Sequence, residues 1–294
     1  MKIAIIGAGN VGSMVASRLV DASLSDVVLM DIIPGLAKGK ALDISDARPI
    51  LNSNVKIVGT DNFKDIQGTD IVVITAGLAR KPGMSRDDLL KKNAEILGDI
   101  SEHVRKQCPL SIVIVVTNPL DVMSYLVMKK TGFEPRRVIG MAGVLDSARF
   151  INIASEKAGN ITGDKIFMMG SHGDTMVAIN RAEDLSETIF KESSDRAKNR
   201  GAEITSHLKT GSAYFAPSAA VFYMLKCVIK NEKKTVCTSV YLQGEYGQND
   251  IYMGVPVTLD SSGVREIVEI ELTDEEKQAF AKSARQIRES IKKL

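Results

Sequence analysis

The feature that most constrains the fold is a regular alternation of short apolar runs and amphipathic segments in the first half of the sequence. The apolar runs are rich in Val and Ile and lack the period-two pattern of half-buried strands, which is typical of strands covered on both faces in a parallel sheet. This order predicts a doubly wound α/β fold. The expected strands are 2–6, 27–30, 55–58, 71–75 and 112–116, and the expected helices are 10–22, 35–46, 87–107 and 119–130.

The second half has a different pattern. Two segments alternate apolar and polar residues as antiparallel strands do, and helices come before and after them. The sequence therefore predicts an α+β region after a boundary near residue 141, which gives units at 1–141 and 142–294. Its expected elements are helices at 146–159, 193–209 and 216–230 and from about 273, and apolar or strand segments at 165–169, 175–180, 234–242 and 251–260.

A glycine pattern, G-x-G-x-x-G, directly follows the first expected strand and opens the first expected helix. In such a turn the first glycine permits a tight bend, the second lets the backbone approach a pyrophosphate, and the third lets the helix pack against the strand. The helix N-terminus adds free N–H groups. Its position between strand and helix indicates a Rossmann dinucleotide site rather than a simple tight turn. The residues are Gly7, Ala8, Gly9, Asn10, Val11 and Gly12.

Asp31 ends the second expected strand. A carboxylate at this position can accept hydrogen bonds from the ribose hydroxyls and repels a 2′-phosphate. The alternative is an ordinary capping Asp. We expect NAD as the cofactor, in preference to NADP.

The stretch GLARKPGMSRDDLL, residues 77–90, carries Arg80 and Arg86 on a loop between a buried strand and a helix. Gly77, Pro82 and Gly83 have the character of a hinge and a stiffener, as in a lid. A lid that closes over a ligand expels water and strengthens the charge interactions inside.

His172 stands out among the three histidines because glycines flank it where an apolar strand breaks, in MMGSHGDTM. Loops on rigid scaffolds often carry function, although an ordinary loop histidine is the alternative. His103 and His207 lie on charged helices, and we interpret both as solvated.

Asp146 and Arg149 are three residues apart near a helix start, so they share one face. A helix surface with a capping Asp is the alternative. Asn118 follows a buried strand and precedes Pro119, where an Asx turn or a helix cap is the alternative.

Composition excludes several classes. With 38 basic and 36 acidic residues, the net charge of +2 gives no reason to expect nucleic acid or an anionic membrane surface as a partner. Three scattered cysteines argue against a disulfide framework and a zinc site, so no metal is expected. No apolar stretch approaches the length of a membrane span. We expect a cytoplasmic protein.

Several motifs together resemble the lactate/malate dehydrogenase family, and within it the lactate-dehydrogenase-like malate dehydrogenases. They occur in the order and close to the spacing of that family, over essentially the whole chain. The motifs are GAGNVGS, AGLARKPGMSRDDLL, VTNPLD, GVLDSARF, GSHGDTM and TGSAYFAPSAA.

The resemblance implies a role for each matching residue. His172 would be the acid/base, Asp146 its orienting carboxylate, and Arg149 the clamp for the C1 carboxylate. Arg86 would polarise the C2 oxygen and Arg80 would bind the second carboxylate of malate or oxaloacetate. Asn118 would contact the substrate. The implied cofactor contacts are Val116, Thr117, Asn118 and Asn93.

The resemblance also implies a substrate class. Lactate dehydrogenases of the family carry a neutral residue, usually glutamine, where this chain has Arg80, so a dicarboxylate is expected. The rivals are the same chemistry on lactate and a non-catalytic NAD-binding sensor. Family members are dimers or tetramers, and we expect a homodimer or homotetramer. Two departures concern the region after His172: the segment before the next helix is short, and Ala178 replaces the usual proline.

Overall fold

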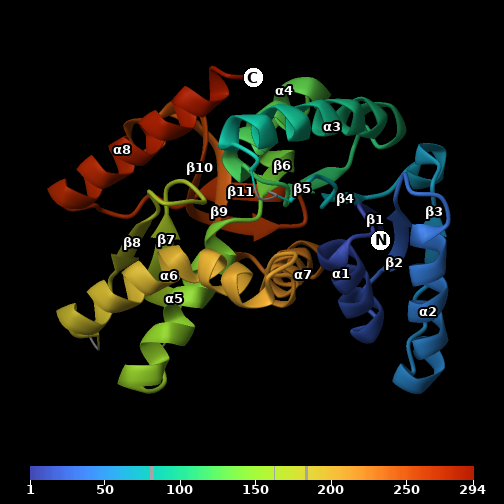
Figure 1. Cartoon of the computed structure of the whole chain (residues 1–294), viewed down its shortest axis with the longest axis horizontal. Helices are drawn as coiled ribbons and strands as arrows, with labels where there is room; N and C mark the ends of the chain where they lie inside the picture. The colour runs from blue at the N-terminus through green and yellow to red at the C-terminus, as the bar shows by residue number, and fades with distance from the viewer. Residues whose placement is uncertain (80–82, 162, 183–184) are drawn as a thin grey trace.

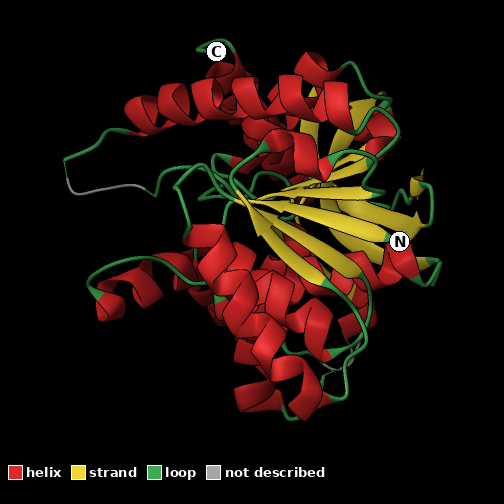
Figure 2. Ribbon diagram, turned by 90° about the vertical axis from the view of Figure 1, so that its right-hand side faces the viewer, coloured by secondary structure: helices red, strands yellow, loops and turns green. Residues whose placement is uncertain are grey.

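The computed structural model describes residues 1–79, 83–161, 163–182 and 185–294. Its centre is a nine-stranded sheet with the order β11-β10-β9-β6-β5-β4-β1-β2-β3. The six strands from β6 to β3 are parallel. They are β1 (Lys2–Ile6), β2 (Asp26–Met30), β3 (Ile57–Thr60), β4 (Ile71–Ile74), β5 (Ile112–Val115) and β6 (Val138–Gly140). Figure 2 shows this sheet with helices above and below it, so that both faces are covered.

The helices of the first half are α1 (Asn10–Asp21), α2 (Leu36–Leu51), α3 (Arg86–Gln107) and α4 (Leu120–Thr131). Those of the second half are α5 (Gly143–Ala158), α6 (Glu187–Leu208), α7 (Phe215–Ile229) and α8 (Asp274–Ile291). Figure 1 shows α1 beside α7, so helices from the two halves of the sequence pack together. The main core lies between the sheet and these helices, and a smaller apolar cluster around Phe150 joins α5, α6 and β7.

The second half extends the same sheet with antiparallel strands. β9 (Lys234–Gln243) pairs along its length with β10 (Asn249–Asp260), and β10 pairs with β11 (Gly263–Ile267). β9 meets β6 through one residue pair, Gly140 and Ser239. Side chains reinforce this seam: the Tyr252 hydroxyl donates to Val138 O at 3.1 Å, and the Thr238 hydroxyl donates to Gly140 O. The sheet is therefore continuous across the two halves.

A separate two-stranded sheet consists of β7 (Ile166–Met169) and β8 (Val177–Asn180), which lie at the left of Figure 1. Ala178 sits in β8 opposite Met168. This pair is not hydrogen-bonded, because Arg181 N donates to Lys165 O three residues away and the bonded pairs of an antiparallel ladder alternate, while Met168 N donates to Ser147 Oγ at 2.9 Å. The N–H of Ala178 therefore points away from β7, where a proline would remove no bond of this ladder.

Most predicted elements are confirmed, but several boundaries were wrong and two strands were missed. The strand expected at 55–58 lies at Ile57–Thr60, paired with β2. The helix expected to end at 46 continues to Leu51 with Pro49 in its last turn, since proline there removes only one backbone hydrogen bond. α6 starts at Glu187, not near 193, because Ser186 caps it. β6 and β11 were missed; β6 has only three residues, and β11 is rich in polar side chains.

Candidate active site

The glycine turn after β1 is shaped by close backbone contacts. Gly7 has φ of +110°, and a Cβ on Gly12 would lie 1.9 Å from the carbonyl oxygen of Gly7. Neither position tolerates a larger residue without a shift. A Cβ on Gly9 would meet nothing within 4 Å, so this backbone is open to a ligand. Gly9 caps α1 without a side-chain hydrogen bond, which leaves the N–H groups of the first turn available to an anion.

The peptide of Ala8, in the middle of this turn, is held from both sides. Its N–H donates to Asp31 Oδ2 at 2.7 Å, and its carbonyl accepts from Lys40 Nζ at 2.7 Å and from Ser13 Oγ at 3.0 Å. Asp31 Oδ1 also accepts from the N–H of Ile33. Asp31 therefore follows β2 as predicted, and it has a second task that the motif does not show, which is to orient the turn.

Asn93 ties the segment after β4 to the segment after β5. Its side chain is fully buried, its Oδ1 accepts from Leu78 N at 2.8 Å, and its Nδ2 donates to Leu78 O and Asn118 O. A direct cofactor contact for Asn93 stays a prediction, because these three bonds are all to backbone. A Cβ on Gly77 would lie 2.4 Å from Thr117 Cγ2, so the two segments approach as closely as a glycine allows.

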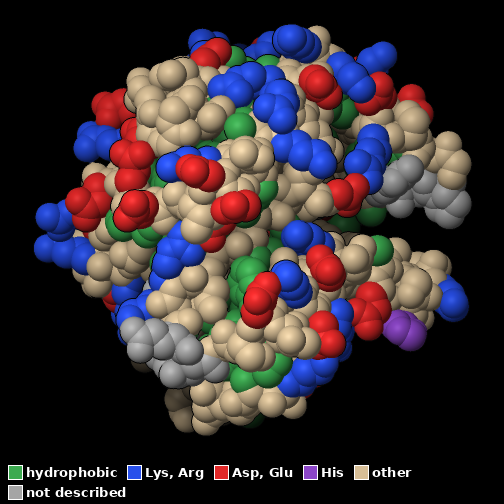
Figure 3. Space-filling model, turned by 90° about the vertical axis from the view of Figure 1, so that its left-hand side faces the viewer, with side chains coloured by type: hydrophobic (Ala, Val, Ile, Leu, Met, Phe, Trp, Pro, Cys, Tyr) green, Lys and Arg blue, Asp and Glu red, His purple; other side chains and the backbone are tan. Residues whose placement is uncertain are grey.

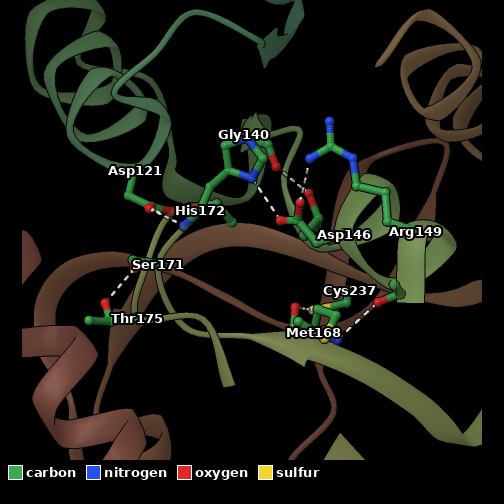
Figure 4. Close-up of polar contacts among 12 residues, drawn as sticks. Asp121, Gly140, Asp146, Arg149, Met168, Ser171, His172, Thr175 and Cys237 are labelled. Atoms are coloured by element: carbon green, nitrogen blue, oxygen red, sulfur yellow. Dashed lines mark hydrogen bonds and ion pairs between the residues drawn. The ribbon is translucent and has the colours of Figure 1, made fainter. Parts of the chain in front are cut away.

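His172 and Asp146 form a dyad, as Figure 4 shows. His172 follows β7 on a loop that Gly170 anchors through two backbone hydrogen bonds with Gly254, each 2.8 Å. Asp146, in the first turn of α5, places Oδ2 2.7 Å from His172 Nδ1 and is buried. A carboxylate at this distance favours the tautomer with a proton on Nδ1. Nε2 is then left to a ligand.

Arg149 lies one helical turn beyond Asp146, with Nη1 3.5 Å from Asp146 Oδ1 and only 13% of its side chain exposed. Its Nε is buried and finds no hydrogen-bond partner among the residues that the structure describes. A buried donor without an acceptor is costly. An anionic ligand would supply the missing acceptor.

The charges around the dyad shift its protonation. Burial lowers the pKa of His172, but the negative charge of Asp146 and its hydrogen bond outweigh burial, so the pKa lies above that of a free imidazole. Burial also lowers the pKa of Arg149, and Arg200 acts in the same direction, while Asp146 opposes them. The guanidinium remains charged at any pH at which the protein folds.

One cavity of about 360 Å³ joins these parts. Six of the predicted site residues line it: Val11, Val116, Thr117, Asn118, Arg149 and His172. Gly201 and Thr205 of α6 and Ala213, before α7, complete its wall. Asn118 precedes a cis peptide bond to Pro119. Figure 3 shows a hollow in one face of the molecule, with charged side chains of both signs spread around it.

Of the two loop arginines, Arg86 lies among the residues that the structure describes. Arg86 is the first residue of α3, and its Nη2 lies 2.6 Å from Asp174 Oδ2. It lines a neighbouring cavity of about 330 Å³ on the other side of His172, not the one with Arg149. Arg80 and Pro82 lie outside the described residues.

Asp121 is a residue near His172 to which the sequence motifs assign no role. Its Oδ2 accepts from the backbone N–H of His172 at 2.9 Å, and its Oδ1 accepts from Ser239 Oγ at 2.7 Å. An Asp in the first turn of a helix is common for dipole reasons alone, so its position in the sequence does not distinguish it. Only the tertiary contacts do.

The described residues also bear on metal binding and on membrane insertion. Among residues 1–79, 83–161, 163–182 and 185–294, no group of three or more His, Cys, Asp or Glu side chains is arranged to hold a metal ion. Over the same residues, no helix has the length and apolar character that crossing a membrane requires.

Taken together, the geometry can hold a carboxylate on Arg149 and move a proton through His172 Nε2. It does so beside a turn suited to a dinucleotide pyrophosphate. The proton carrier, the anion clamp and the cofactor turn come from different halves of the chain and meet at the carboxyl ends of β1, β4 and β5, where ligands bind in open α/β sheets.

Comparison with known proteins gives matches over the whole chain. Residues 1–140 match the family model for the lactate/malate dehydrogenase NAD binding domain, and residues 143–294 match that for the lactate/malate dehydrogenase alpha/beta C-terminal domain. A malate dehydrogenase of Methanosarcina mazei is 44% identical, covering 100% of this chain and 99% of the relative. One from Heliobacterium modesticaldum is 45% identical, covering 100% and 97%.

Solved structures of malate and lactate dehydrogenases have the same fold as this chain. A Cryptosporidium parvum malate dehydrogenase superposes with a TM-score of 0.94 at 38% identity, covering 100% of this chain and 98% of that one. A lactate dehydrogenase from the same organism, complexed with lactic acid and β-nicotinamide adenine dinucleotide, gives 0.93 at 36% identity, covering 99% and 96%.

Proposed function

The chain belongs to the lactate/malate dehydrogenase family, and we propose that it catalyses the reversible, NAD-dependent conversion of (S)-malate to oxaloacetate. Full-length relatives that are 44–45% identical are malate dehydrogenases. The observation that carries the proposal is the dyad of His172 and Asp146 beside Arg149, because His172 and Arg149 line one cavity that also reaches Val11 of the glycine turn.

The residues of the first half fit NAD. Gly9 leaves its backbone open, the first turn of α1 has unused N–H groups, and Asp31 lies where a ribose would be bound. The part of the cavity where we place the nicotinamide ring is lined by Val11, Val116 and Thr117. The bound cofactor would accept or donate a hydride at its nicotinamide ring.

His172 carries the proton in this proposal. In malate oxidation Nε2 takes the proton of the C2 hydroxyl, and in oxaloacetate reduction it returns a proton to the C2 oxygen. Asp146 keeps the proton of the ring on Nδ1 and stabilises the imidazolium that forms. Burial of the dyad strengthens this interaction, because little water competes for the carboxylate.

The arginines divide the recognition of a dianion. Arg149 binds the C1 carboxylate with its fixed fork of donors, which also satisfies its unpartnered Nε. We propose that Arg80 binds the second carboxylate and that Arg86 polarises the C2 oxygen. Arg86 must leave Asp174 to do so. Asn118, which lines both cavities around His172, contacts the substrate.

The test is the absorbance of NADH with oxaloacetate and, separately, with pyruvate. Rapid NADH oxidation with oxaloacetate and slow oxidation with pyruvate support the proposal. Equal rates favour a broad 2-oxo acid reductase, and no rate with either substrate, together with NADH binding, favours an NAD-binding sensor.

Three further points are proposals. We propose a homodimer or homotetramer, because α2 exposes the large apolar side chains of Leu42, Ile50 and Leu51; light scattering after gel filtration tests it. We propose that the chain divides near residue 141 into a cofactor-binding half and a substrate-binding half.

We also propose that the protein is cytoplasmic, since its three cysteines are buried free thiols.

A further inference from the structure

We propose that Asp121 is a positioning residue for His172 and, with Asp146, one of two carboxylates that favour the protonated imidazole. The inference rests on the proposed function, because it takes His172 as the proton carrier. Asp121 is the second residue of α4 and lies three positions after Asn118. It therefore belongs to a different element from Asp146, which is on α5.

The contacts of Asp121 join three elements. Its carboxylate accepts the backbone N–H of His172 at 2.9 Å and the hydroxyl of Ser239, on β9, at 2.7 Å. Its side chain is buried, and Ser239 is the residue through which β9 meets β6. Figure 4 shows Asp121 and Asp146 on different sides of His172. Asp146 fixes the ring, and Asp121 fixes the main chain that carries it.

The hydrogen bonds fit an ionised Asp121. Burial raises the pKa of this carboxyl group above that of a free aspartate, and the bonds from Ser239 and from the His172 N–H offset only part of that increase. Both partners donate, and an ionised carboxylate, which only accepts, matches two donors without bringing a further proton into the site. A charged hydrogen bond of this kind is stronger than a neutral one.

The titratable side chains around His172 differ in charge, and their charges determine how firmly the imidazole holds a proton. Asp146 and Asp121 are anions close to it, and Arg149 is the opposing cation. Cys237 of β9 faces both carboxylates, and because burial and these carboxylates raise the pKa of its thiol, it stays neutral. Arg86 and Asp174 pair with each other on the outer side, where both are exposed. Two anions therefore act on the ring from different elements, and removing either should weaken its hold on a proton.

Three variants separate charge from packing. Asp121→Asn keeps an acceptor for the His172 N–H and a donor for Ser239 but loses the charge. Asp121→Ala loses the charge and both hydrogen bonds. Ser124→Ala, one turn further along α4, removes a buried hydroxyl whose partner is Leu120 O and serves as the matched control. The readouts are thermal unfolding, kcat and KM against pH, and NMR titration of the imidazole. The sequence has only three histidines, so His172→Asn assigns the signal.

We expect Asp121→Asn to move the titration midpoint of His172 to lower pH while KM for oxaloacetate changes little. Asp121→Ala should also lower kcat, by up to roughly 10²-fold, because a displaced catalytic group costs that much. Ser124→Ala should leave the midpoint in place. An unchanged midpoint in Asp121→Asn would overturn the proposal and leave Asp121 a packing residue. The NMR titration needs no turnover, so an unmodified protein that fails to reduce oxaloacetate would refute the proposed function without deciding this one.

Discussion

Arg86 Nη2 lies 2.6 Å from Asp174 Oδ2, and Asp174 is only two residues beyond His172. The side chains are 65% and 70% exposed, so water screens the pair and its contribution to stability is small. In this arrangement Arg86 lines a different cavity from the one that contains Arg149. In the proposed reaction, the substrate competes with Asp174 for the same guanidinium.

Asp174→Asn should therefore lower KM for oxaloacetate, because Arg86 is released and a negative charge near a dianion is removed. Exposed ion pairs contribute roughly 0–1 kcal/mol, so the change in KM should stay within about fivefold. Steady-state kinetics at low and high salt measure it. Glu134→Gln, which breaks the exposed pair with Arg136 beside the start of β6, is the control. A KM that rises in Asp174→Asn would show that Asp174 assists Arg86 instead of competing for it.

His172→Asn should abolish turnover and leave NADH binding nearly intact. General acid–base catalysis typically contributes roughly 10² to 10⁴ in rate, and the glycine turn that is proposed to bind the cofactor is untouched. Fluorescence titration with NADH and stopped-flow kinetics measure the two effects separately. A variant that keeps near-full kcat would remove His172 from the mechanism.

Asp31→Ser should raise the use of NADP relative to NAD, since the repulsion of a 2′-phosphate is lost. It should also weaken the binding of both cofactors, because Asp31 accepts from the N–H of Ala8 in the turn. The ratio of kcat/KM for NADPH and NADH is the measurement. If the unmodified protein already uses both equally, the role given to Asp31 is incorrect.

Arg80→Gln and Arg86→Gln should have different effects on substrate specificity. The first should lower kcat/KM for oxaloacetate by orders of magnitude and raise it for pyruvate, because pyruvate no longer buries an unpaired guanidinium. The second should slow both substrates, since the C2 oxygen is common to both. Ala213 borders the cavity and sets part of its volume, so a full change of substrate requires a further substitution. Equal losses on both substrates in both variants would contradict this division.

The pH dependence should have opposite signs in the two directions. The charge of Asp146 outweighs burial and raises the pKa of His172, so the imidazole keeps its proton to a higher pH than a free one. Oxaloacetate reduction needs that proton and should fall as pH rises through the raised pKa. Malate oxidation needs the neutral ring and should rise over the same interval. Profiles of kcat/KM in both directions test this, and a reduction rate that increases with pH would contradict it.

Most of the fold could be predicted from the sequence, because the patterns that specify its strands and helices lie within short segments. The Val- and Ile-rich runs and the glycine turn fixed the positions of β1, β4 and β5 to within a residue. β6 could not be predicted, because three residues carry no periodicity and the strand exists only through its neighbours, β5 on one side and Ser239 on the other.

The candidate site divides in the same way. His172, Asp146 and Arg149 lie in motifs that can be read from the chain, and the structure brings them together. Asp121 and Asp174 could not be assigned, since their partners lie 51 and 88 positions away. Asn93 was predicted to touch the cofactor, and its three bonds to backbone became visible only in the structure.

The seam between β6 and β9 affects how a truncated chain would behave. Residues 1–141 made alone would leave β6 as an edge strand, with its outer row of N–H and C=O groups bare and the carbonyls of Val138 and Gly140 without their donors. Bare edges of this kind recruit further strands and aggregate. The second half thus covers this edge of the first once both have folded, besides supplying His172, Asp146 and Arg149 to the candidate site, and a chain cut near residue 141 should be prone to aggregate.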